Sequence, residues 1–188
     1  EGILGKIKRF FIKKLYRISL SNLNIQVICQ NQNDIEDVQK ISNLPLINFS
    51  LIEGSGVSLT KFRYSEDDNK IPNVIMASRL LRDKGVMEFA NAARILKERN
   101  INLKMILVGE PDPENPSSIS RAQVTSWQKE GILEYWGHKD DMENILQKSS
   151  IVVLPSYREG FPKILMEAAA CGRAVITTDV PGCRDAIY

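Results

Sequence analysis

The chain has 188 residues, of which 43% are hydrophobic and 26% are charged, a composition typical of a soluble globular protein with one domain or slightly more. No signal peptide is visible, and no apolar run approaches the roughly 18 residues that a membrane-spanning helix needs. Cys29, Cys171 and Cys183 lack metal-ligand spacing and are interpreted as reduced cytosolic thiols, and a single histidine, His138, argues against a metal site built on histidine.

A basic amphipathic helix is expected over residues 2–20. Six Lys or Arg residues and one Glu give residues 1–20 a net charge of +5, so the rest of the chain sums to −3 within the total of +2. The positive charge is therefore local and does not indicate general nucleic-acid binding. Two interpretations stay open: a helix docked on a sheet with a solvated charged face, or a helix that adheres to anionic lipid. The apolar stripe consists of Ile3, Ile7, Phe10, Phe11, Leu15 and Ile18.

Two short strands are predicted next, at residues 25–30 and 46–52. Between them, residues 31–34 form a turn that can cap a short helix through Ile41. The following segment, Gly54 to Phe62, contains Gly-x-Gly-x-x-Leu, which lacks the third glycine of a dinucleotide-binding fingerprint. An NAD-dependent dehydrogenase is therefore disfavoured.

Strand and helix alternate from Pro72 onwards, and a capping box at Asp140-x-x-Glu143 is expected to open one of the helices. Such repeated units predict an α/β fold with a doubly wound parallel sheet, in which ligands bind at the carboxyl ends of the strands. Strands are predicted at 74–77, 103–108, 133–136, 151–155 and 174–177, and helices at 86–96, 118–129, 140–148, 162–172 and from about 183.

The segment from Ile151 to Gly172 carries the strongest functional signal. A buried strand is followed by a tight turn at Glu159-Gly160-Phe161, and Pro162 suits the first position of the next helix. Glycine allows a ligand to approach the backbone, and a helix N-terminus favours an anion. Glu167 lies five residues beyond Pro162, which is about 8 Å along the helix axis. The pattern predicts a site for an extended ligand with phosphate and hydroxyl groups.

The run Glu-Gly-Phe-Pro-Lys-Ile-Leu-Met-Glu, from Glu159 to Glu167, resembles the E-x7-E donor motif of family 4 glycosyltransferases. The Gly-x-Gly-Val segment that begins at Gly54 is similar to the passage between the two domains of these enzymes. The resemblance covers roughly residues 20–188 and implies the GT-B fold, which has two Rossmann-like domains. Residues 1–52 are expected to be the end of the acceptor-side N-terminal domain. Residues 53–188 are expected to be most of the donor domain, truncated at its C-terminus.

The resemblance also implies the roles of the charged residues. Arg79 and Lys84, in an R-x4-K-G segment, are expected to hold the donor diphosphate, and the alternative is two solvated loop cations. Physical chemistry agrees, because preorganised cations stabilise the charge that develops on a leaving diphosphate. Glu159 is expected to accept hydrogen bonds from sugar hydroxyls, and Glu167 from the ribose. Two carboxylates also fit a glycosidase, which is disfavoured because the cations indicate a phosphorylated leaving group.

The remaining donor contacts are also expected from the resemblance. The backbone of Gly160, Phe161 and Pro162 is expected to shape the sugar pocket, and His138 to form a wall of the nucleobase pocket. Gly56 is expected to lie against the donor phosphates, with a simple interdomain turn as the alternative.

The function implied is a retaining, metal-independent hexosyltransferase without a cofactor, which moves sugar from a UDP- or GDP-type donor to a glycan or polyprenyl-linked acceptor in polysaccharide or glycoconjugate synthesis. Its expected location is cytoplasmic, with contact between residues 2–20 and the inner face of the cell membrane left open. The chain alone is expected to bind donor weakly and to transfer nothing. The alternatives are a non-catalytic sugar-nucleotide-binding fragment and an epimerase or phosphorylase of the same architecture.

Overall fold

The computed structural model describes residues 3–22 and 24–187, with the side chains of residues 3 and 4 left out of the description. Residue 2, where the expected helix begins, lies outside the described residues, and so does the side chain of Ile3 in the apolar stripe. The chain forms two compact units, Glu1–Ser55 and Gly56–Tyr188, and each is treated separately. Within the described residues, no helix combines the length and the apolar character that crossing a bilayer requires.

The first unit contains two helices and a two-stranded parallel sheet. Helix α1 spans Ile3–Ser19 and α2 spans Gln32–Ser42. Strands β1 (Val27–Cys29) and β2 (Phe49–Leu51) pair in parallel, with Val27 opposite Phe49. The predicted turn before α2 is confirmed, because the Asn31 side chain accepts a hydrogen bond from the Asp34 backbone N–H at 2.8 Å.

The prediction of a strand over residues 46–52 is wrong for the first half of that range. Leu46–Asn48 form a 3-10 helix, η1, and only Phe49–Leu51 pair with β1. Pro45 directly precedes η1, and the Asn48 backbone N–H donates to the Pro45 carbonyl at 3.0 Å. The side-chain amide of Asn48 also donates to the Ile25 carbonyl at 2.7 Å, which stabilises this turn.

The second unit is built on a five-stranded parallel sheet with the order β5-β4-β3-β6-β7. The predicted doubly wound α/β fold is confirmed by this order, because β3 is central and the chain adds strands first on one side of it and then on the other. The strands are β3 (Asn73–Ala77), β4 (Lys104–Val108), β5 (Glu134–Gly137), β6 (Ile151–Leu154) and β7 (Ala174–Thr177).

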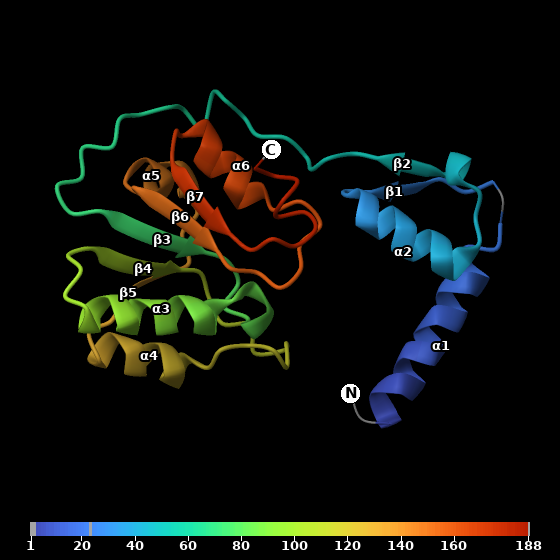
Figure 1. The fold of residues 1–188 in the computed structure, drawn as a ribbon, viewed down its shortest axis with the longest axis horizontal. Helices are drawn as coiled ribbons and strands as arrows, with labels where there is room; N and C mark the ends of the chain where they lie inside the picture. The colour runs from blue at the N-terminus through green and yellow to red at the C-terminus, as the bar shows by residue number, and fades with distance from the viewer. Residues whose placement is uncertain (1–2, 23, 188) are drawn as a thin grey trace. The chain divides into compact units, whose positions relative to one another are not determined.

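Helices cover both faces of this sheet (Figure 1). Helices α3 (Val86–Glu98) and α4 (Arg121–Lys129) bury Phe89 and Trp127 against the face that carries Met76. Helices α5 (Met142–Gln147) and α6 (Lys163–Ala170) pack on the opposite face, where Ala168 and Leu146 meet Val152. Because both faces are covered, the central strands β3 and β4 are continuous buried apolar runs rather than alternating ones.

Three local predictions in this unit are wrong. Pro162 is the N-cap of α6 rather than its first helical residue, with extended backbone angles (φ −73°, ψ 110°). Helix α5 begins after Asp141, which makes no side-chain capping bond, so Asp140 and Glu143 do not form the expected capping box. The predicted helix near Cys183 is a series of turns.

The three cysteines are free and buried. Burial raises the pKa of each thiol, with additional charge effects from neighbouring carboxylates. A thiol with a raised folded-state pKa stays protonated at neutral pH and reacts slowly, because the thiolate is the nucleophile.

We expect Ellman's reagent to label Cys29, Cys171 and Cys183 slowly at pH 7 and all of them promptly in denaturant. The folded state favours the protonated thiol, so this contribution to stability is complete below the unfolded pKa of about 8.5 and is lost as pH rises through the higher folded pKa. Urea unfolding from pH 7 to 10 measures the loss. Prompt labelling of the folded chain at pH 7 would contradict this description.

Candidate functional site

The site is formed where the direction of chain winding reverses. Strands β3 and β6 are neighbours, with Val74 opposite Ile151, although residues 78–150 separate them in the chain. Their carboxyl ends meet at one edge of the sheet, where parallel α/β proteins bind ligands. Arg79 and Lys84 follow β3, and Glu159 follows β6.

The Lys84 ammonium and the Glu159 carboxylate form an ion pair across this reversal. Lys84 Nζ lies 2.6 Å from Glu159 Oε1, and the two side chains are only 21% and 12% exposed. A charge this far removed from water requires a partner, and each of these groups is the partner of the other. The two residues expected to hold different parts of the donor are therefore in direct contact.

Backbone interactions hold the two loops of this pair together. The Asp83 carbonyl accepts hydrogen bonds from the Tyr157 backbone N–H at 2.9 Å and from the Ser156 hydroxyl at 3.1 Å. Gly85 has a φ of +79°, and a Cβ there would lie 2.7 Å from Pro155 Cγ and closer still to the Pro155 carbonyl oxygen. Only glycine fits this close approach, so the sequence Lys84-Gly85 fixes the position of the lysine.

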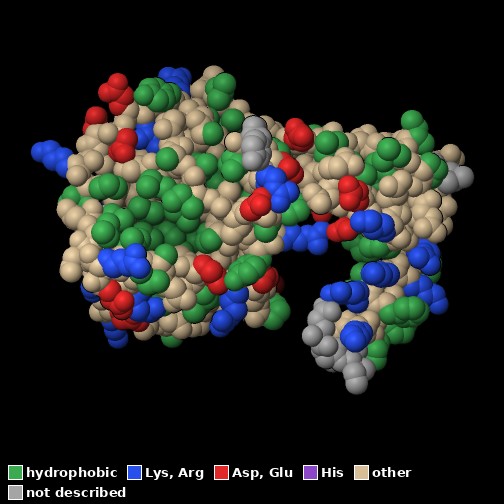
Figure 2. All heavy atoms as spheres, viewed as in Figure 1, with side chains coloured by type: hydrophobic (Ala, Val, Ile, Leu, Met, Phe, Trp, Pro, Cys, Tyr) green, Lys and Arg blue, Asp and Glu red, His purple; other side chains and the backbone are tan. Residues whose placement is uncertain are grey.

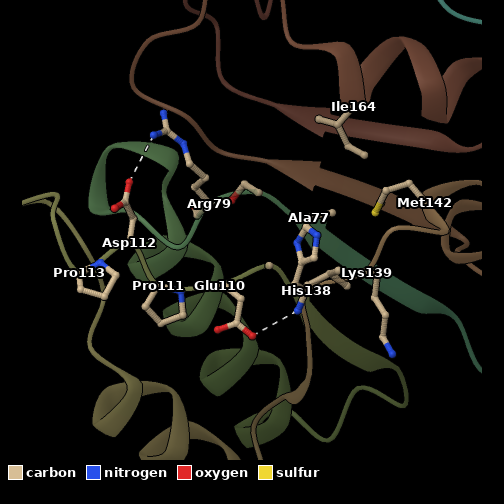
Figure 3. Close-up of a pocket in the computed structure, with 13 residues that line it drawn as sticks. Ala77, Arg79, Glu110, Pro111, Asp112, Pro113, His138, Lys139, Met142 and Ile164 are labelled. Carbon is tan, nitrogen blue, oxygen red and sulfur yellow. Dashed lines mark hydrogen bonds and ion pairs between the residues drawn. The ribbon is translucent and has the colours of Figure 1, made fainter.

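A cavity of about 450 Å³ opens at the same edge of the sheet, at the ends of β3, β4 and β5. Figure 3 shows Arg79 and Asp112 on one side of it and Met142 and Ile164 on the other. The Arg79 guanidinium lies 3.4 Å from the Asp112 carboxylate, and its side chain is 64% exposed. Arg79 is thus positioned at the mouth of the cavity by a weak, solvent-accessible pair.

Glu110 organises the wall of the cavity that His138 belongs to. Its carboxylate accepts a hydrogen bond from the His138 backbone N–H at 3.4 Å (Figure 3). It also accepts from the Arg121 guanidinium at 2.6 Å. Behind it, the Tyr135 hydroxyl donates to the Gly109 carbonyl at 3.0 Å. Burial, and then the Glu110 carboxylate, raise the pKa of Tyr135, so the phenol stays protonated and keeps this bond.

Glu167 is a buried carboxylate on α6, and its carboxylate lies 3.2 Å from the Lys163 ammonium. Lys163 pairs with this carboxylate while its own side chain stays 59% exposed. Ile164, which lines the cavity, lies three residues before Glu167, so both are on neighbouring parts of one helix face. Glu167 itself is not among the residues that line the cavity.

The structure brings some of the expected residues together. Arg79 and His138 line the cavity, and Lys84 and Glu159 pair at the same edge of the sheet. Gly160, Phe161 and Pro162 form the turn between Glu159 and α6, with Pro162 buried.

Gly56 is exposed, with a φ of +73° and no heavy atom within 4 Å of the position of a Cβ. Within the described part of the chain, no other expected residue therefore lies within 4 Å of that position. Within the same described ranges, no three His, Cys, Asp or Glu side chains gather in a way that suits a metal ion.

Sequence reasoning missed Glu110 and Asp112. Both follow β4 in Gly109-Glu110-Pro111-Asp112-Pro113, and a carboxylate directly after a parallel strand was the available signal.

Comparison with known proteins agrees with this geometry. A family model described as "Glycosyl transferases group 1" matches residues 71–188. A relative from Campylobacter jejuni, named N,N'-diacetylbacillosaminyl-diphospho-undecaprenol alpha-1,3-N-acetylgalactosaminyltransferase, is 35% identical over all of this chain and 50% of its own length. The capsular polysaccharide biosynthesis glycosyltransferase CapM from Staphylococcus aureus is 25% identical over 98% of the chain and 48% of its length. The chain thus spans about half the length of these curated relatives.

Solved structures share the fold. The Anabaena protein Alr3699/HepE, in complex with UDP, aligns with a TM-score of 0.77 at 18% identity over 94% of this chain and 51% of its own. The C-terminal domain of a group 1 glycosyl transferase from Francisella tularensis aligns with a TM-score of 0.54 at 25% identity over 65% of the chain and 70% of its own. The expected resemblance to glycosyltransferases is confirmed.

Replacing Lys84 by Ala is expected to lower the free energy of unfolding by about 2–3 kcal/mol, because the Glu159 carboxylate loses its cation in a partly buried site. Adding Glu159→Gln to Lys84→Ala should restore about 1 kcal/mol or more of the lost free energy of unfolding, because the unpaired carboxylate is then removed. Urea unfolding of both single variants and the double variant measures this coupling.

The control is the exposed pair of Arg94 and Glu130, whose nitrogen–oxygen distance is 2.8 Å and whose side chains are each 38% exposed. Arg94→Ala should cost less than about 1 kcal/mol, because water screens this pair. Equal losses for Arg94→Ala and Lys84→Ala, with no coupling between Lys84 and Glu159, would contradict the account.

Proposed function

Because the chain belongs to the group 1 glycosyl transferases, we propose that it contains the donor-binding part of a retaining hexosyltransferase that uses a UDP- or GDP-activated sugar. The proposed acceptor is a glycan or a polyprenyl-linked sugar, in the synthesis of a polysaccharide or glycoconjugate. Support for the acceptor comes from the relatives: one is named for a diphospho-undecaprenol substrate and another for capsular polysaccharide biosynthesis.

The observation that carries the proposal is the Lys84–Glu159 pair, with its 2.6 Å contact, at the same edge of the sheet as the 450 Å³ cavity. A nucleotide sugar has a flat base, a charged centre and a hydroxyl-rich end. The cavity offers apolar walls with a few polar groups, which suits a base. The ion pair offers a cation and an acceptor side by side, which suits the junction of phosphate and sugar.

In the proposed reaction, the bond between the anomeric carbon and the diphosphate oxygen breaks, and the diphosphate takes the bonding electrons. Negative charge therefore increases on the leaving group, and cations that are already in place favour the transition state. The oxygen of the acceptor hydroxyl bonds to the anomeric carbon, and its proton passes to the leaving diphosphate. Lys84 is held by its loop and its carboxylate partner, and Arg79 reaches from the mouth of the cavity. We propose that these two cations act without a divalent metal or another cofactor.

Glu159 and Glu167 are proposed to recognise hydroxyl groups at two places along the donor. The Glu159 carboxylate has one oxygen 2.6 Å from Lys84, so its remaining lone pairs are available to a sugar hydroxyl near the phosphate. Glu167 is displaced along α6 on the side of Ile164, which lines the cavity, and is proposed to accept from the ribose. Gly160, Phe161 and Pro162 are proposed to shape the space for the sugar.

Helix α1 is proposed to bind the surface of an anionic membrane, where a lipid-linked acceptor is found. Six Lys or Arg residues and no acidic residue occur in residues 3–19, and Figure 2 shows basic and hydrophobic side chains together along this helix. Its exposed apolar side chains include Phe10 at 65% and Leu15 at 63%. This combination is typical of helices that lie in a lipid–water interface. With its free thiols, the protein is proposed to work in the cytoplasm at the inner face of the cell membrane.

A ligand-observed NMR screen tests the proposal directly. We expect UDP or GDP, and at least one of its sugars, to bind the chain equally well with and without EDTA. Arg79→Ala should weaken nucleoside-diphosphate binding by about tenfold or more, through loss of a charge-assisted bond, whereas Arg94→Ala should leave it unchanged. Absence of binding to every nucleotide would contradict the proposal, and recovery of lost binding by Mn²⁺ would contradict metal independence.

Glu159→Gln and Glu167→Gln should have different effects, because Gln keeps the shape of the side chain and removes its charge. Glu159→Gln should weaken binding of the intact nucleotide sugar while changing the affinity for the nucleoside diphosphate little. Glu167→Gln should weaken both about equally, since both ligands carry the ribose. Each loss should be about 1–2 kcal/mol by calorimetry. If Glu159→Gln weakened both ligands equally, the donor would lie in the opposite direction along α6.

Co-sedimentation with vesicles tests the proposed membrane contact. The chain should bind vesicles that contain phosphatidylglycerol more strongly than neutral ones. Reversing Lys13 and Lys14 to Glu should lower this binding by about tenfold or more, at about 1 kcal/mol for each cation near the surface. The control reverses Lys104 and Lys129, which are exposed outside α1 and change the net charge equally. Equal losses in both double variants would show that net charge alone, and not α1, controls binding.

A further inference from the structure

A turn after the last strand packs directly beneath the Glu159 turn. Gly182 is buried in this turn with a φ of +79°. A Cβ at Gly182 would lie 2.5 Å from the Glu159 carbonyl oxygen and closer still to the Gly160 carbonyl oxygen. Both obstacles are backbone atoms, so they cannot be moved by a change of rotamer. Any larger residue at Gly182 must therefore change the packing between this turn and the backbone that carries Glu159.

The turn that holds Gly182 is itself firmly attached. The Thr177 hydroxyl donates to the Leu154 carbonyl at 2.7 Å, and the Thr178 hydroxyl donates to the Ser156 carbonyl. Within the turn, the Gly182 backbone N–H donates to the Asp185 carboxylate at 3.1 Å. The two threonine bonds connect the start of the turn to the end of β6, the strand that leads to Glu159. The turn is therefore a fixed support and not a loose loop.

Cys183 fixes the same turn from below. Its side chain is fully buried in a cluster with Leu154 and Leu165, which joins β6, α6 and the turn. Burial raises the pKa of the Cys183 thiol, and the nearby Glu159 carboxylate adds to the effect. The cluster therefore attaches the turn to β6 and α6, the two elements on either side of Glu159.

We propose that Gly182 is a positioning residue for Glu159, through which the turn at residues 178–187 sets the distance between the Glu159 carboxylate and the sugar of the donor. The inference rests on the proposed function for the identity of the ligand. The close approach of Gly182 to the Glu159 turn does not depend on that function. Gly182 acts on the sugar end, because it supports Glu159 and Gly160 and contacts neither the cavity nor Arg79. Replacing Gly182 should therefore weaken binding of the sugar part of the donor and leave the affinity for the nucleotide unchanged.

Gly182→Ala tests the proposal, with Gly131→Ala as the matched control. Gly131 also has a positive φ, +65°, but a Cβ there would meet only the end of the flexible Lys97 side chain, at 3.1 Å. Both variants thus carry a similar backbone cost, and only Gly182→Ala moves the Glu159 turn. Two quantities are measured: the amide NMR shifts of Glu159 and Gly160 in the free chain, and the ratio of the affinities for UDP-N-acetylgalactosamine or UDP-N-acetylglucosamine and for UDP.

Gly182→Ala should shift both amides and lower the sugar-to-UDP affinity ratio by about tenfold, corresponding to roughly 1.4 kcal/mol, while Gly131→Ala should change neither. Unchanged amides and an unchanged ratio in Gly182→Ala would overturn the proposal, as would equal changes in both variants. If wild-type chain binds no UDP ligand, the proposed function fails in this form, and the amide shifts alone then decide the role of Gly182.

A second variant covers the case in which Gly182→Ala does not fold. Thr178→Val keeps the shape of the side chain but removes the hydroxyl that bonds to the Ser156 carbonyl. It should move the Glu159 and Gly160 amides and lower the same ratio in the same direction, by about threefold for one neutral hydrogen bond. Unchanged amides and ratio in a folded Thr178→Val chain would overturn the proposal.

Discussion

The ion pair of Lys84 and Glu159 is the interaction on which the site depends. Each side chain is largely removed from water, so each needs the opposite charge of the other at 2.6 Å. This requirement ties the loop after β3 to the loop after β6, where the two halves of the sheet meet. Gly85 and the Ser156 hydroxyl make the close approach possible from the backbone side. The fold supplies the edge of the sheet, and the ion pair defines one position along it.

The cations at this edge are paired with carboxylates of the same chain. Arg79 contacts Asp112, Lys84 contacts Glu159, and Lys163 contacts Glu167. A diphosphate that binds there must share these cations with their carboxylates or displace the carboxylates. Its binding free energy is therefore the difference between the ion pairs that it forms and the ion pairs within the chain that it weakens. The exposed Arg79 can change partner at low cost, whereas Lys84 cannot leave Glu159 without burying an unpaired charge. On the proposed function, Arg79 is the adaptable contact and Lys84 the fixed one.

Much of the fold could be predicted from the sequence, because local patterns determine it. Apolar runs such as residues 105–108 and 151–154 can be satisfied only as strands covered on both faces, and the structure confirms them. The predicted strand fails at Leu46–Asn48, where tertiary contacts outweigh the local preference for a strand. The predicted capping box fails because α5 begins after Asp141 and not after Asp140. The turns around Cys183 pack beneath Glu159, and no local signal indicates that contact.

The candidate site was predicted only as a set of separate residues. The sequence places Lys84 after one strand and Glu159 after another, and the structure brings these two residues together at one edge of the sheet. The sequence could not show that Lys84 and Glu159 touch, since they are 75 residues apart. The ligand roles of these residues, the assignment of residues 1–52 to an acceptor-side domain and the contribution of Gly56 stay predictions.

A crystal structure of the chain with an intact nucleotide sugar would test the central claim most directly, namely that the cavity and the Lys84–Glu159 pair are two ends of one donor site. The account predicts the base in the cavity against His138, the diphosphate within hydrogen-bond reach of Lys84, and a sugar hydroxyl bonded to the Glu159 carboxylate. A base bound outside the cavity would contradict it. So would a sugar that points into solvent while Lys84 contacts no phosphate and keeps only its bond to Glu159.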